Sequence, residues 1–69
     1  MNTAKLNALL RRATTAKSGR DTYRINKGFE DQGYLMIDTT YFYEGRITAA
    51  LTQAGLAWEK TTYGIKVAI

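Results

Sequence analysis

The chain has 69 residues, with ten lysines and arginines against six acidic residues, and therefore a formal charge of +4. It contains no histidine, no cysteine and no proline. Because imidazole and thiol groups supply the commonest acid-base catalysts, covalent nucleophiles and zinc ligands, we expect a binding protein rather than an enzyme, with no metal and no cofactor.

The composition is that of a globular protein. Hydrophobic residues make up 45% of the chain and aromatic residues 12%, which is enough apolar surface to form a core. No apolar run is long enough for a transmembrane helix or a signal peptide, so we expect no membrane contact and a cytoplasmic location. A chain this short has a thin core, and stabilisation as a homodimer is one hypothesis.

Residues 4–17 have the apolar spacing of an amphipathic helix. The apolar positions of one helical face recur at i, i+3, i+4 and i+7: Leu6, Leu9, Leu10 and Ala13. Asn2 and Thr3 are the candidate N-caps, and Gly19 is placed to end the helix in the left-handed conformation.

Two strands are predicted next, over residues 22–27 and 34–39. Alternation places the following apolar pairs on shared strand faces: Tyr23 with Ile25, and Leu35 with Ile37. The intervening residues 28–33 have a glycine at each end and two acids in the middle, which suits a hairpin loop.

A second helix is predicted after this hairpin. Apolar positions from Tyr43 onward again follow helical spacing, through Ile47 and Leu51. The candidate N-caps are Thr39 and Thr40, and a glycine stands just past the expected end.

The remaining residues 56–69 predict a second hairpin. The alternating apolar positions are Leu56 and Trp58, followed by Tyr63, Ile65, Val67 and Ile69. We expect the turn within residues 60–64, where Gly64 could form a bulge, and we expect Trp58 to lie in the core.

The predicted order is therefore helix, strand, strand, helix, strand, strand. It favours one small two-layer α+β domain over residues 1–69, with a four-stranded antiparallel sheet and two helices on one face. A winged helix is the alternative, because a helix followed by a strand-turn-strand wing matches the end of the chain. That fold would need helices within residues 22–39, where alternation predicts strands.

No motif in the sequence specifies an activity. Gly28 and Gly33 have the spacing of half a phosphate-binding loop, but the lysine and the serine or threonine that must follow are missing. Glu30 and Asp31 would also repel a phosphate within that loop. The carboxylates have no spacing that demands convergence, so we predict no catalytic, cofactor-binding or metal-binding residue.

Positive charge is concentrated at the start of the chain. Residues 1–27 hold seven cations and one acid, whereas residues 28–69 have a net charge of −2. Such asymmetry indicates either an anionic partner or a helix face kept soluble by like charges. An arginine pairs with phosphate or carboxylate through two parallel hydrogen bonds, which suits the first interpretation. The predicted partner-binding cations are Arg11, Arg12, Lys17, Arg20, Arg24 and Lys27.

Aromatic and methionine side chains form the second part of the predicted binding site. Tyr34 and Met36 occupy the strand face opposite the apolar pair, so we expect them to be exposed. Tyr41, Phe42 and Tyr43 cannot all be buried by one helical turn, and we include Tyr41 and Phe42 in the site. The competing interpretation is that one of these two rings fills the gap between the helix and the sheet.

These features predict a small non-enzymatic protein that acts by steric association with a macromolecule. The first hypothesis is a protein-binding regulator or inhibitor, of the kind carried by phages and plasmids, that docks on an acidic protein surface. The alternatives are a basic nucleic-acid-binding module that uses the same cations, and a homodimeric structural protein. Asp38 and Glu44 flank the aromatic residues, which disfavours a phosphate track beside them.

Overall fold

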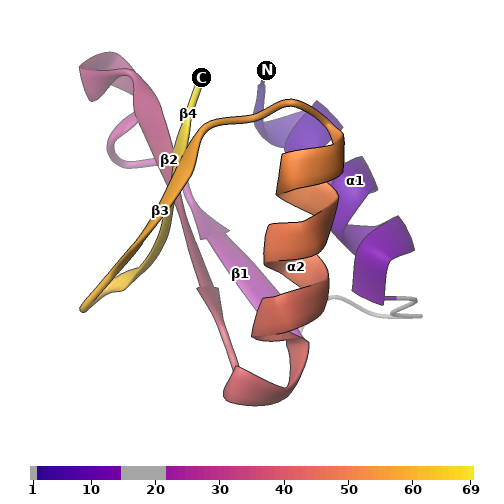
Figure 1. The fold of residues 1–69 in the computed structure, drawn as a ribbon. Coiled ribbons are helices and arrows are strands. Elements are labelled where there is room, and N and C mark those ends of the chain that lie inside the picture. The colour runs from indigo at the N-terminus through magenta and orange to yellow at the C-terminus, as the bar shows by residue number, and fades with distance from the viewer. Residues whose placement is uncertain (1, 15–21) are drawn as a thin grey trace.

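The computed structural model describes residues 2–14 and 22–69. Its elements are shown in Figure 1 and are, in chain order, α1 (Thr3–Thr14), β1 (Tyr23–Asn26), the 3-10 helix η2 (Glu30–Gln32), β2 (Tyr34–Thr39), α2 (Tyr41–Gln53), β3 (Trp58–Thr61) and β4 (Gly64–Ala68). The predicted helix end at Gly19 and the predicted site residues Lys17 and Arg20 lie outside the described residues.

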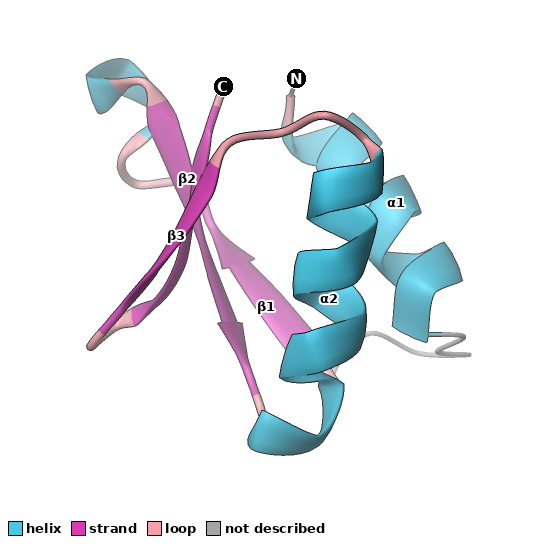
Figure 2. Ribbon diagram, viewed as in Figure 1, coloured by secondary structure: helices cyan, strands magenta, loops and turns pink. Residues whose placement is uncertain are grey.

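The four strands form one antiparallel sheet in the order β1-β2-β4-β3. Figure 2 shows two layers, with α1 and α2 both on one face of the sheet. The predicted α+β fold is confirmed. The winged helix is excluded because β1 and β2 account for most of residues 22–39, with only the short η2 in their connection.

Helix α1 has the predicted cap and the predicted buried stripe. The Oδ1 atom of Asn2 accepts a hydrogen bond from the backbone N–H of Lys5 at 2.8 Å, which satisfies one free donor of the first turn. Leu6 and Leu10 are fully buried. The hydroxyl of Thr14 donates to the carbonyl oxygen of Leu10 at 2.8 Å in the last turn.

Strands β1 and β2 place their apolar alternation against the helices, as predicted. Ile25 lies opposite Ile37 in the register, and Ile37 and Leu35 are fully buried. Tyr23 is also buried, and its hydroxyl donates to the side-chain oxygen of Asn7 at 2.6 Å. This hydrogen bond joins β1 to α1.

Helix α2 begins at Tyr41, two residues before the start of the apolar spacing. Thr40 is the N-cap residue, although its side chain makes no capping hydrogen bond. The stripe that packs on the sheet consists of the partly buried Tyr43 and the fully buried Ile47 and Leu51.

A two-residue turn, Thr62 and Tyr63, joins β3 to β4. Gly64 pairs with Thr61 at the end of the ladder and forms no bulge. Its φ is +135°, and a Cβ atom there would collide with the carbonyl oxygen of Ile37 on β2. Only glycine meets both conditions, so the close approach of β4 to β2 depends on Gly64.

The core lies between the sheet and the two helices. Its buried residues are Leu6, Leu10, Tyr23, Leu35, Ile37, Ile47, Leu51, Ile65 and Val67. Every helix and strand apart from η2 and β3 contributes at least one of them. Strand β3 is therefore attached to the molecule chiefly through its pairing with β4.

The prediction that Trp58 lies in the core is wrong. Its ring is on the side of the sheet that the helices cover, because it pairs with the buried Val67. However, β3 is an edge strand, so no further strand packs beside the ring, and Trp58 is 39% exposed. The indole Nε1–H donates to the hydroxyl of Thr52 on α2 at 2.9 Å.

Candidate partner-binding surface

Three large aromatic side chains are exposed at one end of the molecule. Tyr41 and Phe42, in the first turn of α2, are 91% and 72% exposed. Tyr63, in the turn between β3 and β4, is 82% exposed. The start of α2 and this turn both lie toward the lower end of Figure 1, and both line one pocket. We call Tyr41, Phe42 and Tyr63 the aromatic end.

The first turn of α2 exposes these rings because only one side of the helix faces the sheet. Tyr43, rather than Tyr41 or Phe42, packs against the core, so the gap-filling interpretation is wrong for both of them. Phe42 meets the ring of Tyr43 edge-on with centroids 4.9 Å apart, and the guanidinium of Arg46 lies 5.9 Å from the Phe42 centroid. Two neighbours therefore orient Phe42 while it stays open to solvent.

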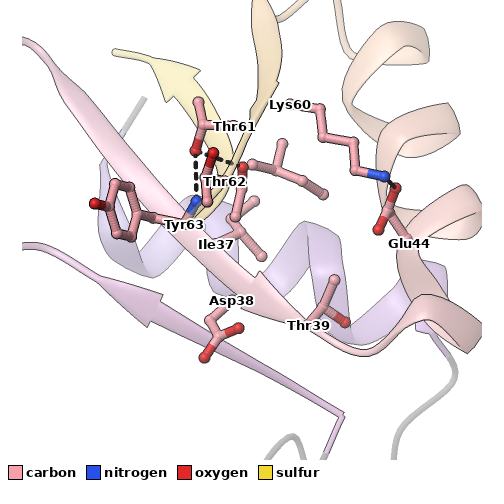
Figure 3. Close-up of a pocket in the computed structure, with 10 residues that line it drawn as sticks. Ile37, Asp38, Thr39, Glu44, Lys60, Thr61, Thr62 and Tyr63 are labelled. Atoms are coloured by element: carbon pink, nitrogen blue, oxygen red, sulfur yellow. Dashed lines mark hydrogen bonds and ion pairs between the residues drawn. The ribbon is translucent and has the colours of Figure 1, made fainter.

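A pocket of about 210 Å³ lies between the first turn of α2, which contributes Glu44, and the turn that carries Tyr63 (Figure 3). It is lined by Ile37, Asp38, Thr39, Glu44, Lys60, Thr61, Thr62, Tyr63, Gly64 and Ile65. Small-molecule sites usually measure about 300–1,000 Å³, so a pocket of this size suits one side chain of a partner better than a substrate.

Hydrogen bonds within the turn hold the Tyr63 side of this pocket. The hydroxyl of Thr61 donates to the carbonyl oxygen of Gly64 at 3.0 Å and accepts the backbone N–H of Tyr63 at 3.1 Å, as the dashed lines in Figure 3 show. The turn is thus tied at both sides, and Tyr63 projects from a fixed backbone.

An ion pair closes the other side of the pocket. The Nζ atom of Lys60 lies 2.7 Å from Oε1 of Glu44. The hydrogen bond and the charge of Glu44, with a smaller contribution from Tyr41, raise the pKa of Lys60. Lys60 therefore stays protonated at neutral pH and cannot act there as a base or a nucleophile.

The structure does not gather on one surface the four predicted cations that lie within the described residues. Arg11, Arg12, Arg24 and Lys27 are all exposed. Arg24 follows the buried Tyr23 in β1, so alternation turns it to the sheet face away from the helices. Among residues 2–14 and 22–69 the one ion pair is between Lys60 and Glu44, so no described acid pairs with these four cations.

Arg11 and Arg12 also diverge, because successive side chains on a helix point about 100° apart. Arg11 lies near the hydroxyl of Tyr23, on the β1 side of α1, where its charge partly offsets the effect of burial on the pKa of that tyrosine. Arg12 lines a groove between α1 and α2, beside Ala13 and Ala50.

Met36 was predicted to be exposed, and this prediction is wrong. Met36 does lie on the face opposite Leu35, but it is only 9% exposed. It occupies a central strand, paired with Asn26 on one side and Lys66 on the other, and the hydroxyl of Thr61 lies 3.9 Å from its sulfur. The side chains beside Met36 on the same face of the sheet therefore cover it, although α1 and α2 both pack on the opposite face.

Tyr34, predicted to be exposed as well, is half-buried. Its ring stacks on Phe29 with centroids 5.1 Å apart and planes 10° apart. The ammonium of Lys66 lies 4.5 Å from the centroid of the same ring. Both neighbours compete with a nucleobase for the faces of Tyr34, which makes it a poor stacking platform.

Tyr63 is the surface residue that the sequence reasoning missed. Its spacing from Ile65 suggested a place in the alternating strand, whereas the strand begins only at Gly64. The one local signal is Gly64, since a glycine marks a turn or its edge, but Thr62 and Tyr63 are residues typical of strands and do not identify the turn themselves.

This end of the molecule combines exposed rings, a small pocket and an ion pair. No helix among the described residues is both long and apolar enough to cross a membrane. The chain matches no protein family, no curated protein and no solved structure in the comparisons made with each of them.

Proposed function

We propose that this protein is a non-enzymatic binding protein that docks on a partner protein through the aromatic end and blocks or regulates that partner sterically. The observation that carries the proposal is the exposure of Tyr41, Phe42 and Tyr63, between 72% and 91%, at the end of the molecule where Tyr63 and Glu44 line one pocket. Buried tyrosine and tryptophan anchors supply much of the binding energy in protein interfaces, and exposing such rings without a partner is costly.

The net positive charge of the chain favours a partner with an acidic surface. At the aromatic end Arg46 lies over Phe42, whereas Arg24 stands opposite Asp38 in the register of β1 and β2. A net charge of +4 would speed the encounter with an acidic surface, and rim cations then fix its orientation. The aromatic rings would supply the buried contact.

The proposal is tested by affinity capture from nuclease-treated extract of the native cell. The baits are the natural chain, a Tyr41→Ser, Tyr63→Ser double variant, and an Asp31→Ser, Gln32→Ser control that changes two exposed residues of the β1–β2 connection. We expect one protein to be retained by the natural chain and by the control, with retention by the aromatic variant at least about tenfold lower, because hot-spot rings contribute ~2 kcal/mol or more.

Three results would overturn the proposal. The first is equal retention by all three baits, and the second is retention of no protein at all. The third is capture of nucleic acid when nuclease is omitted, with salt-sensitive binding to duplex DNA that the Arg11→Glu, Arg12→Glu variant loses. This third result would identify a nucleic-acid-binding module.

A further inference from the structure

The outer edge of β3 presents free backbone groups beside the aromatic end. In an antiparallel ladder, successive residues direct their N–H and C=O groups alternately toward one side and the other. The N–H of Ala68 donates to the carbonyl oxygen of Ala57 at 3.0 Å, so Ala57 faces β4. Glu59 and Thr61 then face β4 as well, and the backbone groups of Trp58 and Lys60 point outward from the sheet.

The side chains of these two outward-facing residues are held in place by α2. Trp58 is fixed by its hydrogen bond to Thr52, and Lys60 by its ion pair with Glu44. Lysines on edge strands usually hinder the addition of another strand. Here Figure 3 shows the Lys60 side chain running toward Glu44 on α2, so its ammonium is drawn away from the edge.

Glu59 carries an unbalanced charge on the other face of the same edge. Its partner in the register is Lys66, whose ammonium lies instead over the ring of Tyr34. Within the described ranges 2–14 and 22–69, Glu59 takes part in no ion pair. A cation supplied from outside the chain would therefore find an exposed carboxylate at the centre of the edge.

We infer that β3 accepts an extended segment of the partner as a fifth, antiparallel strand, with a lysine or arginine opposite Glu59 and large apolar residues on either side of it. This inference rests on the proposed function and deepens it. The apolar residues would exchange backbone hydrogen bonds with Trp58 and Lys60 and pack beside the indole ring. The residue opposite Glu59 would occupy a non-hydrogen-bonded pair, where Cα atoms are about 4.5 Å apart and side chains are closest.

A second copy of this chain fits the edge less well. If two β3 strands paired so that Trp58 and Lys60 exchanged hydrogen bonds, Glu59 would stand directly opposite Glu59 of the other copy. Like charges in that position are destabilising. The partner strand is therefore assigned to a different protein, and dimerisation of the natural chain through β3 would count against the inference.

A tethered strand tests the edge directly. A strand of four valines with a central lysine is fused after Ile69 through a twelve-residue Gly-Ser linker, whose typical span of about 19 Å reaches either end of β3. Amide hydrogen exchange is then measured by NMR. We expect the amides of Trp58 and Lys60 to exchange at least about tenfold more slowly than in the same chain with the linker alone, while Ile25 on β1 is unchanged.

Charge reversal supplies the matched control. A strand with glutamate at its centre should protect the two amides at least about fivefold less, and Glu59→Lys should reverse the preference between the two strands. Equal protection by both strands, or protection by neither, overturns the inference.

A proline substitution separates strand addition from side-chain contact. Lys60→Pro and Lys60→Ala both remove the ion pair with Glu44, but only proline removes the outward N–H, at an edge position where proline is tolerated. Thermal unfolding confirms that each variant folds. Because both variants lose the same side-chain contacts, the comparison is between them, and we expect Lys60→Pro to retain the captured partner at least about tenfold less than Lys60→Ala.

The same capture distinguishes failure of the inference from failure of the proposed function. If both Lys60 variants retain the partner, or both lose it equally, strand addition is wrong; loss in the Tyr41→Ser, Tyr63→Ser variant would still support docking through the aromatic end. If the natural chain captures no partner, the proposed function is wrong, and the tethered strand still decides what the edge accepts.

Discussion

Strand β1 forms one edge of the sheet and β3 forms the other, and each has four residues. The N–H of Ile69 donates to the carbonyl oxygen of Gly33 at 3.0 Å, so by alternation the outward backbone groups on β1 belong to Tyr23 and Ile25. Tyr23 is 7% exposed and belongs to the core, and Ile25 packs against it. On β3 the corresponding residues are Trp58 and Lys60, both exposed.

The burial of its outward-facing residues therefore determines whether an edge strand is accessible to a further strand (an open edge) or covered (a closed edge). Tyr23 is drawn inward by its hydrogen bond to Asn7 and by the core. Trp58 and Lys60 are tied only to the surface of α2, through Thr52 and Glu44. Both edges have the backbone groups that an added strand needs, but only β3 presents them on exposed residues.

The largest expected effect comes from breaking the attachment of the β3–β4 hairpin. Gly64→Ala places a Cβ atom against the carbonyl oxygen of Ile37 and strains a positive φ, so we expect a loss of about 2–4 kcal/mol in the free energy of unfolding. Urea unfolding followed by circular dichroism measures it. The control is Gly45→Ala in α2, where a Cβ atom meets nothing within 4 Å and about 0.5–1 kcal/mol of stabilisation is expected. Equal free energies of unfolding for Gly64→Ala and Gly45→Ala would show that Gly64 does not lie this close to the carbonyl oxygen of Ile37.

The closed edge is tested by removing the hydroxyl of Tyr23. Tyr23→Phe leaves Asn7 without its donor in a half-buried site, and we expect the free energy of unfolding to fall by about 1–2 kcal/mol. Tyr63→Phe removes a hydroxyl from an 82% exposed ring and should change it by less than about 0.5 kcal/mol. Similar losses in both variants would mean that the Tyr23 hydrogen bond does not stabilise β1.

The same tyrosine predicts a dependence on alkaline pH. Burial raises the pKa of Tyr23 above its ordinary value of 10.0, and the nearby charge of Arg11 only partly offsets this. Because the folded state favours the neutral hydroxyl, its stability contribution is complete below pH 10 and is lost as the pH rises from there through the folded pKa. Melting temperatures between about pH 9 and pH 11 should fall less steeply in Tyr23→Phe than in the natural chain. Parallel curves would refute this.

The smallest expected effect is at the open edge. Trp58→Phe removes the indole donor to Thr52 at a site in contact with water, so we expect a loss below about 1 kcal/mol. A double-mutant cycle with Thr52→Val isolates the hydrogen bond, with an expected coupling of about 0.5 kcal/mol. If the coupling energy between Trp58 and Thr52 exceeded the loss of unfolding free energy caused by Tyr23→Phe, β3 would be held more firmly than β1, which is the opposite of what we expect.

The fold followed from periodicity, because each element buries one face and the apolar residues mark that face. The spacing of Leu6 and Leu10 located α1, and the alternation of Leu35 and Ile37 located β2. The start of α2 was less certain from the sequence, since its first turn carries rings that face away from the core.

The candidate site was predicted in part. Tyr41 and Phe42 are exposed as expected, but alternation shows only which side of a strand a residue occupies. It does not show that Met36 is in a central strand or that Trp58 is in an edge strand, and this strand order reverses both expected exposures. Proximity in sequence likewise did not place Arg24 on the same surface as α1. The partner class, the compartment and the homodimer remain predictions.

The close approach of Gly64 to Ile37 also fixes the alignment of the hairpin with the rest of the sheet. A slip of one residue would bring the side chain of Tyr63 or Ile65 against the same carbonyl oxygen, and would turn the apolar residues of β4 toward solvent. Because only a residue without a Cβ atom fits at this position, β4 can pair with β2 in one register only. The exposed strand β3, which pairs with β4, is held in the same register.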